Sequence, residues 1–120
     1  CRPDFSILMY PVISFTGEFQ HSGSRRALVG DDETLMRYYS NELQVTGRTP
    51  PAILIHSADD RSVPAENSIV YYQALLENGV PGELHIYPYG GHGYSLAIGM
   101  GHLSGWPERA FDWVRSLQKN

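Results

Sequence analysis

The fold of this chain is decided by a short apolar run and the acidic loop that follows it, Ala52-Ile53-Leu54-Ile55-His56-Ser57-Ala58-Asp59-Asp60-Arg61-Ser62-Val63-Pro64. The apolar part, residues 52–56, has the length of a strand and lacks polar alternation, which is typical of a strand covered on both faces of a parallel sheet. Pro64 predicts the start of a helix, because the N–H that proline lacks has no partner in a first helical turn.

A second strand and loop follow one helix later. The strand is Leu84-His85-Ile86-Tyr87, whose partial alternation predicts a place near the sheet edge, and the loop is Tyr89-Gly90-Gly91-His92-Gly93-Tyr94. The helix between them ends at Asn78-Gly79. If the two strands are parallel neighbours, Asp60 and His92 emerge at the same edge of one sheet.

The flanking sequence completes an alternating order of strands and helices. An almost uninterrupted apolar run, Phe5–Ile13, predicts a first strand with Pro11 near its exit, and a polar excursion rich in Gly and Ser follows over 14–30. Two more helices are predicted, one from Asp31 and one from Pro107. We therefore expect an α/β fold in which a parallel sheet of about three strands is covered by helices. The first run is too apolar for a free edge, so we expect further strands before Cys1.

Composition excludes several classes of protein. The 120 residues suit one domain or part of one, and 42% hydrophobic with 18% charged residues is typical of a globular chain. A formal charge of −4 argues against nucleic acid as a partner. The single cysteine, Cys1, excludes an internal disulfide and a zinc site built from Cys, and no run approaches the ~18 apolar residues of a membrane span. Because the chain starts without Met and close to a strand, we expect it to begin inside a domain.

Asp60 and His92 are the candidate catalytic residues. They are 92 − 60 = 32 positions apart, which is one crossover unit. A general base needs an imidazole held in one tautomer, and a carboxylate on its far nitrogen does this. The alternative is a turn histidine among glycines, with Asp59 and Asp60 serving turns and helix caps. For the acid we prefer Asp60 to Asp59, which is the candidate for capping the loop.

The other chemically capable side chains have structural interpretations. His56 is expected at a strand end, and the spacing of His85, His92 and His102 matches no metal site. Tyr94 and the loop that continues to residue 105 lie beside the histidine and could contact substrate. We expect packing roles for two groups of aromatic residues, namely Trp106 and Trp113 in the last helix, and Tyr10, Tyr38, Tyr39, Tyr71 and Tyr72 in or near the core.

The acid loop and the histidine loop resemble those of the α/β-hydrolase superfamily. The stretch from His56 to Pro64, with Asn67-Ser68 after it, resembles the pattern His-Gly-x-x-Asp-x-x-Val-Pro, and Gly90-Gly91-His92-Gly93 resembles the histidine loop. The match is best to bacterial carboxylesterases of the acetyl-xylan/feruloyl esterase type, which also resemble prolyl oligopeptidase-like hydrolases. Further stretches that read like that group are Arg2-Pro3-Asp4-Phe5, Tyr10-Pro11-Val12-Ile13-Ser14, Tyr38-Tyr39-Ser40-Asn41-Glu42, Thr49-Pro50-Pro51-Ala52 and Val80-Pro81-Gly82-Glu83-Leu84-His85-Ile86-Tyr87.

The resemblance covers the C-terminal half of the family's domain. It implies Asp60 as the relay acid, His92 as the base, and a small-molecule or carbohydrate ester as substrate. We expect no cofactor and no metal, and neither nucleic acid nor a membrane as a partner. Ser57 stands where the family often has Gly. The nucleophile elbow Gly-x-Ser-x-Gly and the oxyanion loop have no match, and neither Ser22-Gly23-Ser24 nor Tyr94-Ser95 has the elbow's context.

The expected function is therefore that of part of a serine carboxylesterase, inactive on its own. A fragment of a prolyl oligopeptidase-type serine peptidase is a second hypothesis. A non-catalytic hydrolase-like binding module is a third.

Overall fold

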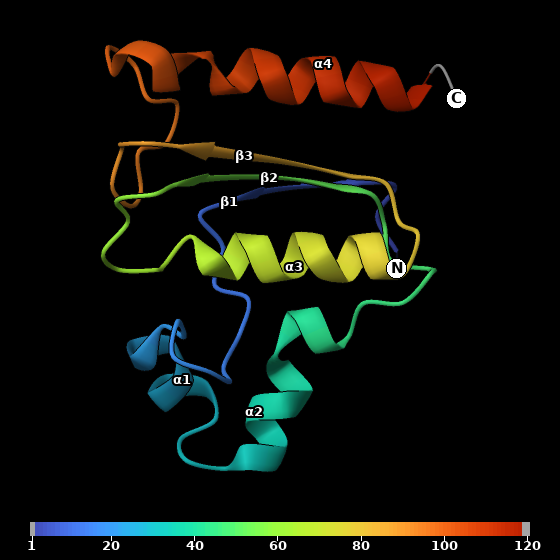
Figure 1. Ribbon diagram of the computed structural model, residues 1–120, viewed down its shortest axis with the longest axis vertical. Coiled ribbons are helices and arrows are strands. Elements are labelled where there is room, and N and C mark those ends of the chain that lie inside the picture. The colour runs from blue at the N-terminus through green and yellow to red at the C-terminus, as the bar shows by residue number, and fades with distance from the viewer. Residues whose placement is uncertain (1, 119–120) are drawn as a thin grey trace.

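A computed structural model describes residues 2–118, and its centre is one parallel sheet (Figure 1). The strands are β1 (Ser6–Met9), β2 (Ala52–Ser57) and β3 (Gly82–Tyr87), in the order β1-β2-β3. The α/β class and the alternation predicted from the sequence are confirmed. Within the described chain, the buried run at residues 52–57 is the central strand, as expected from its lack of polar alternation.

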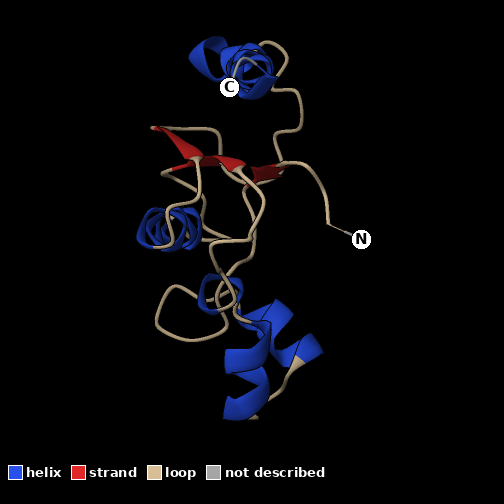
Figure 2. Cartoon of the chain, turned by 90° about the vertical axis from the view of Figure 1, so that its right-hand side faces the viewer, coloured by secondary structure: helices blue, strands red, loops and turns tan. Residues whose placement is uncertain are grey.

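Helices cover both faces of this sheet. Helix α3 (Glu66–Glu77) lies on one face and α4 (Trp106–Gln118) on the other, as Figures 1 and 2 show. Successive strand residues point to opposite faces, so Ile53 and Ile55 pack toward α4 with Trp106 and Trp113, whereas Ala52 and Leu54 pack with Leu75 of α3. The predicted packing roles of the two tryptophans are confirmed.

The segment between β1 and β2 forms a separate small layer below α3 in Figure 1. It contains α1 (Ser22–Leu28), α2 (Glu33–Tyr39) and the short 3-10 helix η1 (Asn41–Leu43). A second 3-10 helix, η2 (Gly101–Gly105), lies outside this layer and directly precedes α4. The buried amide of Asn67, on α3, attaches this layer: it accepts the N–H groups of Ile13 and Ser14 and donates to the carbonyl of Phe19.

Two expectations about this part of the chain are corrected. The helix from residue 31 ends at Tyr39, and its Tyr38 and Tyr39 are 65% and 41% exposed instead of lying in the core. Tyr71 and Tyr72, in contrast, do pack near the core as expected. The first strand also ends earlier than its apolar run, at Met9, because Tyr10 turns the chain with a φ of 37° just before Pro11.

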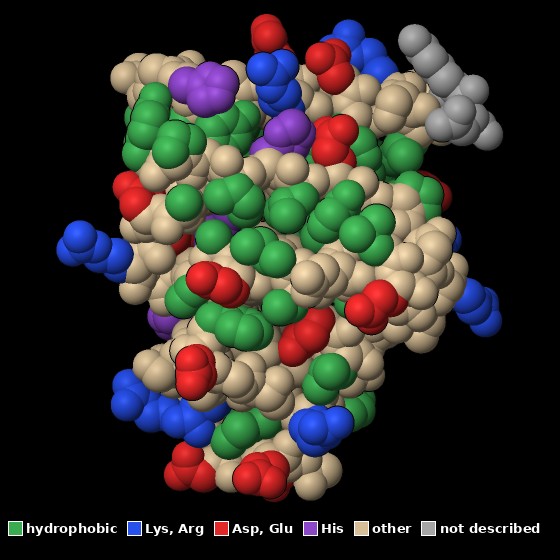
Figure 3. All heavy atoms as spheres, viewed as in Figure 1, with side chains coloured by type: hydrophobic (Ala, Val, Ile, Leu, Met, Phe, Trp, Pro, Cys, Tyr) green, Lys and Arg blue, Asp and Glu red, His purple; other side chains and the backbone are tan. Residues whose placement is uncertain are grey.

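The surface carries mixed charge. On the face seen in Figure 3, Lys and Arg side chains are scattered among Asp and Glu instead of forming one patch. Among the helices of residues 2–118, none has the length and apolar character needed to cross a membrane.

Candidate active site

The acid loop and the histidine loop leave neighbouring strands at the same edge of the sheet. Ser57, the last residue of β2, is in register with Tyr87, the last residue of β3, and the N–H of Ala58 extends this pairing to the Tyr87 carbonyl at 2.7 Å. The two loops therefore start side by side. This is the juxtaposition that the sequence predicts for Asp60 and His92.

Asp60 is buried and held by its own loop. Its Oδ1 accepts the N–H groups of Ser62 at 2.9 Å and Val63 at 2.8 Å, which closes the turn that leads into α3. Burial acts to raise the pKa of Asp60, but the hydrogen bonds from Val63, His92 and Ser62 outweigh it, so the net pKa lies below its usual range. The side chain is therefore a carboxylate at neutral pH.

His92 completes the predicted contact. Its Nδ1 donates to Asp60 Oδ2 at 2.7 Å, and within residues 2–118 the ring makes no other hydrogen bond. The side chain is 37% exposed. Because the carboxylate fixes the proton on Nδ1, Nε2 is the ring atom that can accept a proton from another group.

Tyr10 packs against His92, a contact that the sequence did not predict. Its ring meets the His92 ring edge-on at a centroid distance of 4.8 Å, and it meets Tyr94 in the same way at 4.9 Å. Tyr10 directly follows β1, so all three strands send a residue to this edge. Its position directly before Pro11, where the sequence predicts the exit of the first strand, was a signal that could have found it. Tyr94 itself is buried, and the exposed large apolar residues of its loop are Leu96 and Ile98. Substrate contact by this loop stays a prediction.

His56 lies beneath the acid and shares its carboxylate. Its Nε2 is 3.2 Å from Asp60 Oδ2 and 2.8 Å from the Val63 carbonyl, and its Nδ1 is 2.7 Å from Ser68 Oγ. A carbonyl only accepts hydrogen bonds, so Nε2 carries the ring proton and Nδ1 accepts from the hydroxyl. Burial lowers the pKa of His56, so the ring is neutral. The expected structural role at a strand end agrees with this burial, but the contact with Asp60 was missed.

Asp59 and Ser57 contact the histidine loop instead of the imidazole. Asp59 Oδ1 accepts the N–H of Gly91 at 2.8 Å, and Ser57 Oγ donates to the carbonyl of the same glycine. Of the two aspartates that the sequence left open as partners of His92, Asp60 is the one in contact.

Other candidates from the sequence lie elsewhere. His85 pairs with Glu83 at 3.0 Å on the edge strand β3, and His102 is exposed in η2. Ser22 and Ser24 belong to α1. Ser95 has a φ of 50° but lies in a turn, not between a strand and a helix. Thus no serine of residues 2–118 combines the elbow's setting with a hydrogen bond to His92.

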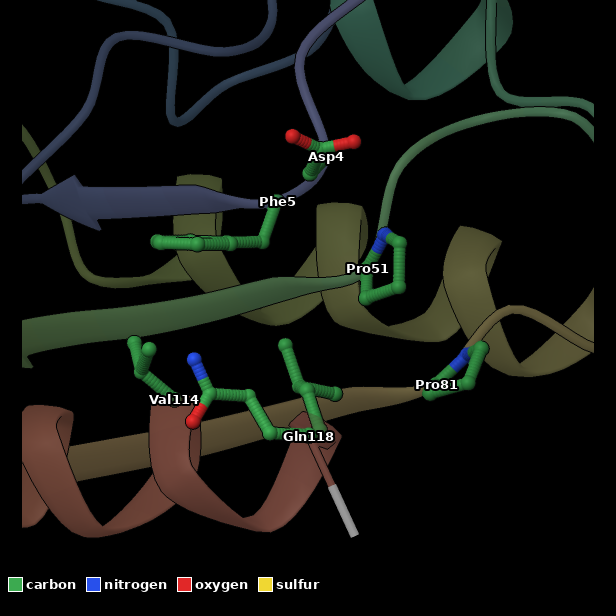
Figure 4. Close-up of a pocket in the computed structure, with 7 residues that line it drawn as sticks. Asp4, Phe5, Pro51, Pro81, Val114 and Gln118 are labelled. Carbon is green, nitrogen blue, oxygen red and sulfur yellow. The ribbon is translucent and has the colours of Figure 1, made fainter. Parts of the chain in front are cut away.

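A pocket of about 530 Å³ lies at the opposite end of the sheet (Figure 4). Phe5, Pro51 and Pro81, which precede the three strands, line it together with the end of α4. Among residues 2–118, Asp4 is its only charged lining residue, and no histidine, serine or lysine lines it. The chemically capable groups are therefore at the carboxyl edge and not in this pocket.

Comparisons with known proteins identify relatives of this chain. An acetylxylan esterase of Xylanibacter ruminicola is 36% identical over 97% of this chain, and endo-1,4-beta-xylanase B of Butyrivibrio fibrisolvens is 40% identical over 98%. The crystal structure of an acetyl ester-xyloside bifunctional hydrolase from Caldicellulosiruptor lactoaceticus superposes with a TM-score of 0.94 at 44% identity over 98% of the chain. The chain spans only 25%, 18% and 44% of these three proteins, respectively. A model of the prolyl oligopeptidase family matches residues 6–119, and the chain therefore belongs to this family of α/β-hydrolases.

Proposed function

We propose that this chain supplies the acid and the base of a serine carboxylesterase, with Asp60 as the acid and His92 as the base. The observation that carries the proposal is the 2.7 Å contact between Asp60 Oδ2 and His92 Nδ1, because it joins a buried carboxylate to an accessible imidazole. The nucleophile would be a serine outside these 120 residues, since the Gly-x-Ser-x-Gly pattern does not occur in them.

The proposed chemistry is acyl transfer. The serine hydroxyl attacks the ester carbonyl while His92 Nε2 takes its proton, and the negative Asp60 stabilises the imidazolium that forms. His92 then gives this proton to the leaving alcohol, which breaks the ester bond and leaves an acyl-enzyme. In the second half, water attacks the acyl-enzyme with His92 again as base, and the acid product and free serine are released.

We propose small acyl esters of plant polysaccharides as the substrates. This rests on the relatives: one is named an acetylxylan esterase and another an acetyl ester-xyloside hydrolase. The proposed acyl transfer uses only side chains and water. Because the chain spans less than half of these relatives, recognition of the sugar and the acyl group also depends on segments beyond it.

A chimera tests the proposal directly. The segment of the Caldicellulosiruptor hydrolase that superposes on this chain would be replaced by the chain itself, which a TM-score of 0.94 makes practicable. We expect the chimera to hydrolyse p-nitrophenyl acetate and to release acetate from acetylated xylan. His92→Ala should lower kcat/KM by at least about 1000-fold. His85→Ala is the matched control. His85 lies on β3, the strand that leads into the histidine loop, but it pairs with Glu83 outside the site.

The chain alone provides the complementary measurement. Without nucleophile and oxyanion donors it should show no esterase rate above that of a folded control protein, and a fluorophosphonate probe should label the chimera but not the chain. A labelled and active chain would contradict the proposal, since one of its own serines would then be the nucleophile.

The family match supports a second candidate, a serine peptidase. The same chimera distinguishes it if it is offered a prolyl peptide p-nitroanilide beside the ester. Cleavage of the amide but not of the ester would favour the peptidase. A folded chimera that cleaves neither would favour a non-catalytic binding module.

A further inference from the structure

We propose that Ser57 and Asp59 are positioning residues that hold the backbone of Gly91 from both sides and so keep His92 against Asp60. The inference rests on the proposed function, because it concerns the geometry of the same acid and base. It assigns a role to two polar residues that take no part in proton transfer.

The two side chains bind both polar groups of one residue. Asp59 Oδ1 accepts the Gly91 N–H at 2.8 Å, and the Ser57 hydroxyl donates to the Gly91 carbonyl. Gly91 directly precedes His92 in the chain. The peptide groups on either side of Gly91, the second of which leads into His92, are therefore fixed to the acid loop by Asp59 and to the end of β2 by Ser57.

The histidine loop lacks other means of holding this position. From residue 88 to 93 the described structure has no backbone–backbone hydrogen bond, and Gly90, Gly91 and Gly93 have φ values of 143°, 65° and 77°. Glycine at positive φ has wide conformational freedom, and fixing it costs more entropy than fixing any other residue. A loop of this kind needs outside hydrogen bonds to present one geometry.

The electrostatics of Asp59 fit a bound acceptor instead of a free surface charge. The N–H of Gly91 is the main cause that lowers the pKa of Asp59, and the Gly90 N–H and the Ser57 hydroxyl act in the same direction. The residue is nevertheless exposed, so its carboxylate contributes nothing to the hydrophobic core. Removing it should affect the loop far more than the fold.

Solution NMR of the full 120-residue chain tests the proposal independently of any activity. In the unchanged chain the Gly91 amide should be protected from hydrogen exchange, and the proton on His92 Nδ1 should give a resolved, hydrogen-bonded resonance. In the double variant Ser57→Ala with Asp59→Ala, we expect Gly91 exchange to rise by about 10-fold or more and the Nδ1 resonance to broaden beyond detection. The single variant Asp59→Asn should retain both signals in part, since the amide oxygen of asparagine can still accept the Gly91 N–H.

Asp32→Ala is the matched control. Asp32 is also an exposed carboxylate that accepts one backbone N–H, that of Leu35 at 3.1 Å, but it caps the distant α2. This variant should leave both histidine-loop signals unchanged. If the double variant does not fold, the pair Asp59→Ala and Asp59→Asn carries the same comparison.

One result overturns the inference, namely a folded Asp59→Ala or double variant with an exposed Gly91 amide but an unchanged His92 Nδ1 resonance. The kinetic arm uses the chimera, where the double variant should lower kcat by about 10-fold with little change in KM, because a misplaced base affects the transition state more than binding. If the unchanged chimera is inactive, the proposed function fails, but the NMR comparison still decides the positioning role.

Discussion

The acid loop and the histidine loop meet at one edge of the sheet, yet they are stabilised in opposite ways. The acid loop is stabilised by hydrogen bonds within the loop: Asp60 is buried and accepts the N–H groups of Ser62 and Val63. The histidine loop is rich in glycines at positive φ and takes its hydrogen bonds from its neighbour. The acid is thus fixed by local sequence, whereas the position of the base depends on tertiary contacts.

The two histidines beside Asp60 make the same contrast at the level of single side chains. Both approach Oδ2, His56 at 3.2 Å and His92 at 2.7 Å. His56 is fully buried and has both ring nitrogens engaged, while His92 is partly exposed and has a nitrogen without a partner in the described chain. Both residues are histidines, so the difference does not come from the residue type. Solvent exposure and a ring nitrogen without a hydrogen-bond partner decide which imidazole can transfer a proton.

The largest expected effect comes from Asp60→Asn. The amide would turn a donor toward one of the three N–H groups that Asp60 accepts, and His92 would lose the partner that fixes its tautomer. We expect kcat of the chimera to fall by about 10⁴-fold, the size of effect seen when a relay carboxylate becomes an amide.

Asp59→Asn is the control for that variant, since it makes the same chemical change one residue away. It should stay within a few-fold of the unchanged chimera. Equal losses for Asp59→Asn and Asp60→Asn would show that general loop damage, not the loss of a relay acid, causes the effect.

Gly90→Ala should damage the histidine loop next most strongly. A Cβ at residue 90 would lie 2.5 Å from Leu103 Cδ2, and Leu103 is fully buried and cannot yield easily. The φ of 143° adds backbone strain. We expect a loss of about 3 kcal/mol in the free energy of unfolding, measured in urea at pH 7.

Gly91→Ala separates the two causes. Its φ of 65° is also unfavourable for alanine, but its Cβ would meet nothing within 4 Å. Only strain remains, so the loss should be about 1 kcal/mol. Similar losses for both variants would mean that close packing against Leu103 does not hold the loop.

The sequence predicted the parts of this site that depend on local patterns. The buried run at β2, the partly alternating β3 and the loops after them are visible because strand residues, glycines and acids signal their structure over a few positions. The parallel register then follows from topology, and with it the meeting of Asp60 and His92.

The missed features depend on contacts between distant segments. Tyr38 and Tyr39 are large aromatic residues of the kind expected near a core, but in the described chain they are 65% and 41% exposed. Tyr10 reaches His92 only because β1 lies beside β2 and turns at residue 10. The binding of Gly91 by Asp59 could not be predicted, since an aspartate in a turn has many possible backbone partners.

Tyr10→Leu tests the ring contacts of Tyr10 with His92 and Tyr94, and its effect on stability should be smaller than that of Gly90→Ala. It removes the edge-on contacts with His92 and Tyr94 but keeps an apolar side chain. We expect a loss of about 1 kcal/mol in unfolding free energy, the scale of aromatic pairs. Tyr10→Phe keeps the ring and should cost less; if it costs as much, the contribution lies in the hydroxyl group and not in the ring.

The smallest expected effect is a change in how stability depends on pH. His56 has its pKa lowered by burial in the folded state, so between its folded value and the unfolded value of 6.5 the unfolded chain binds more protons. Its contribution is therefore fully present above 6.5 and is lost as pH falls below it. Asp59 and Asp60, whose pKa values are also lowered, add their loss only below about 3.8.

His56→Gln isolates the first of these windows. The variant should be less stable than the unchanged chain at pH 7. Because glutamine cannot take up a proton, however, the urea midpoint of the variant should change less between pH 7 and pH 5 than that of the unchanged chain. His85→Gln is the control, because its ring pairs with Glu83 in a partly exposed position. If His56→Gln keeps the full pH dependence, another group titrates in this range, and the contrast between a neutral, buried His56 and an accessible His92 would have to be given up.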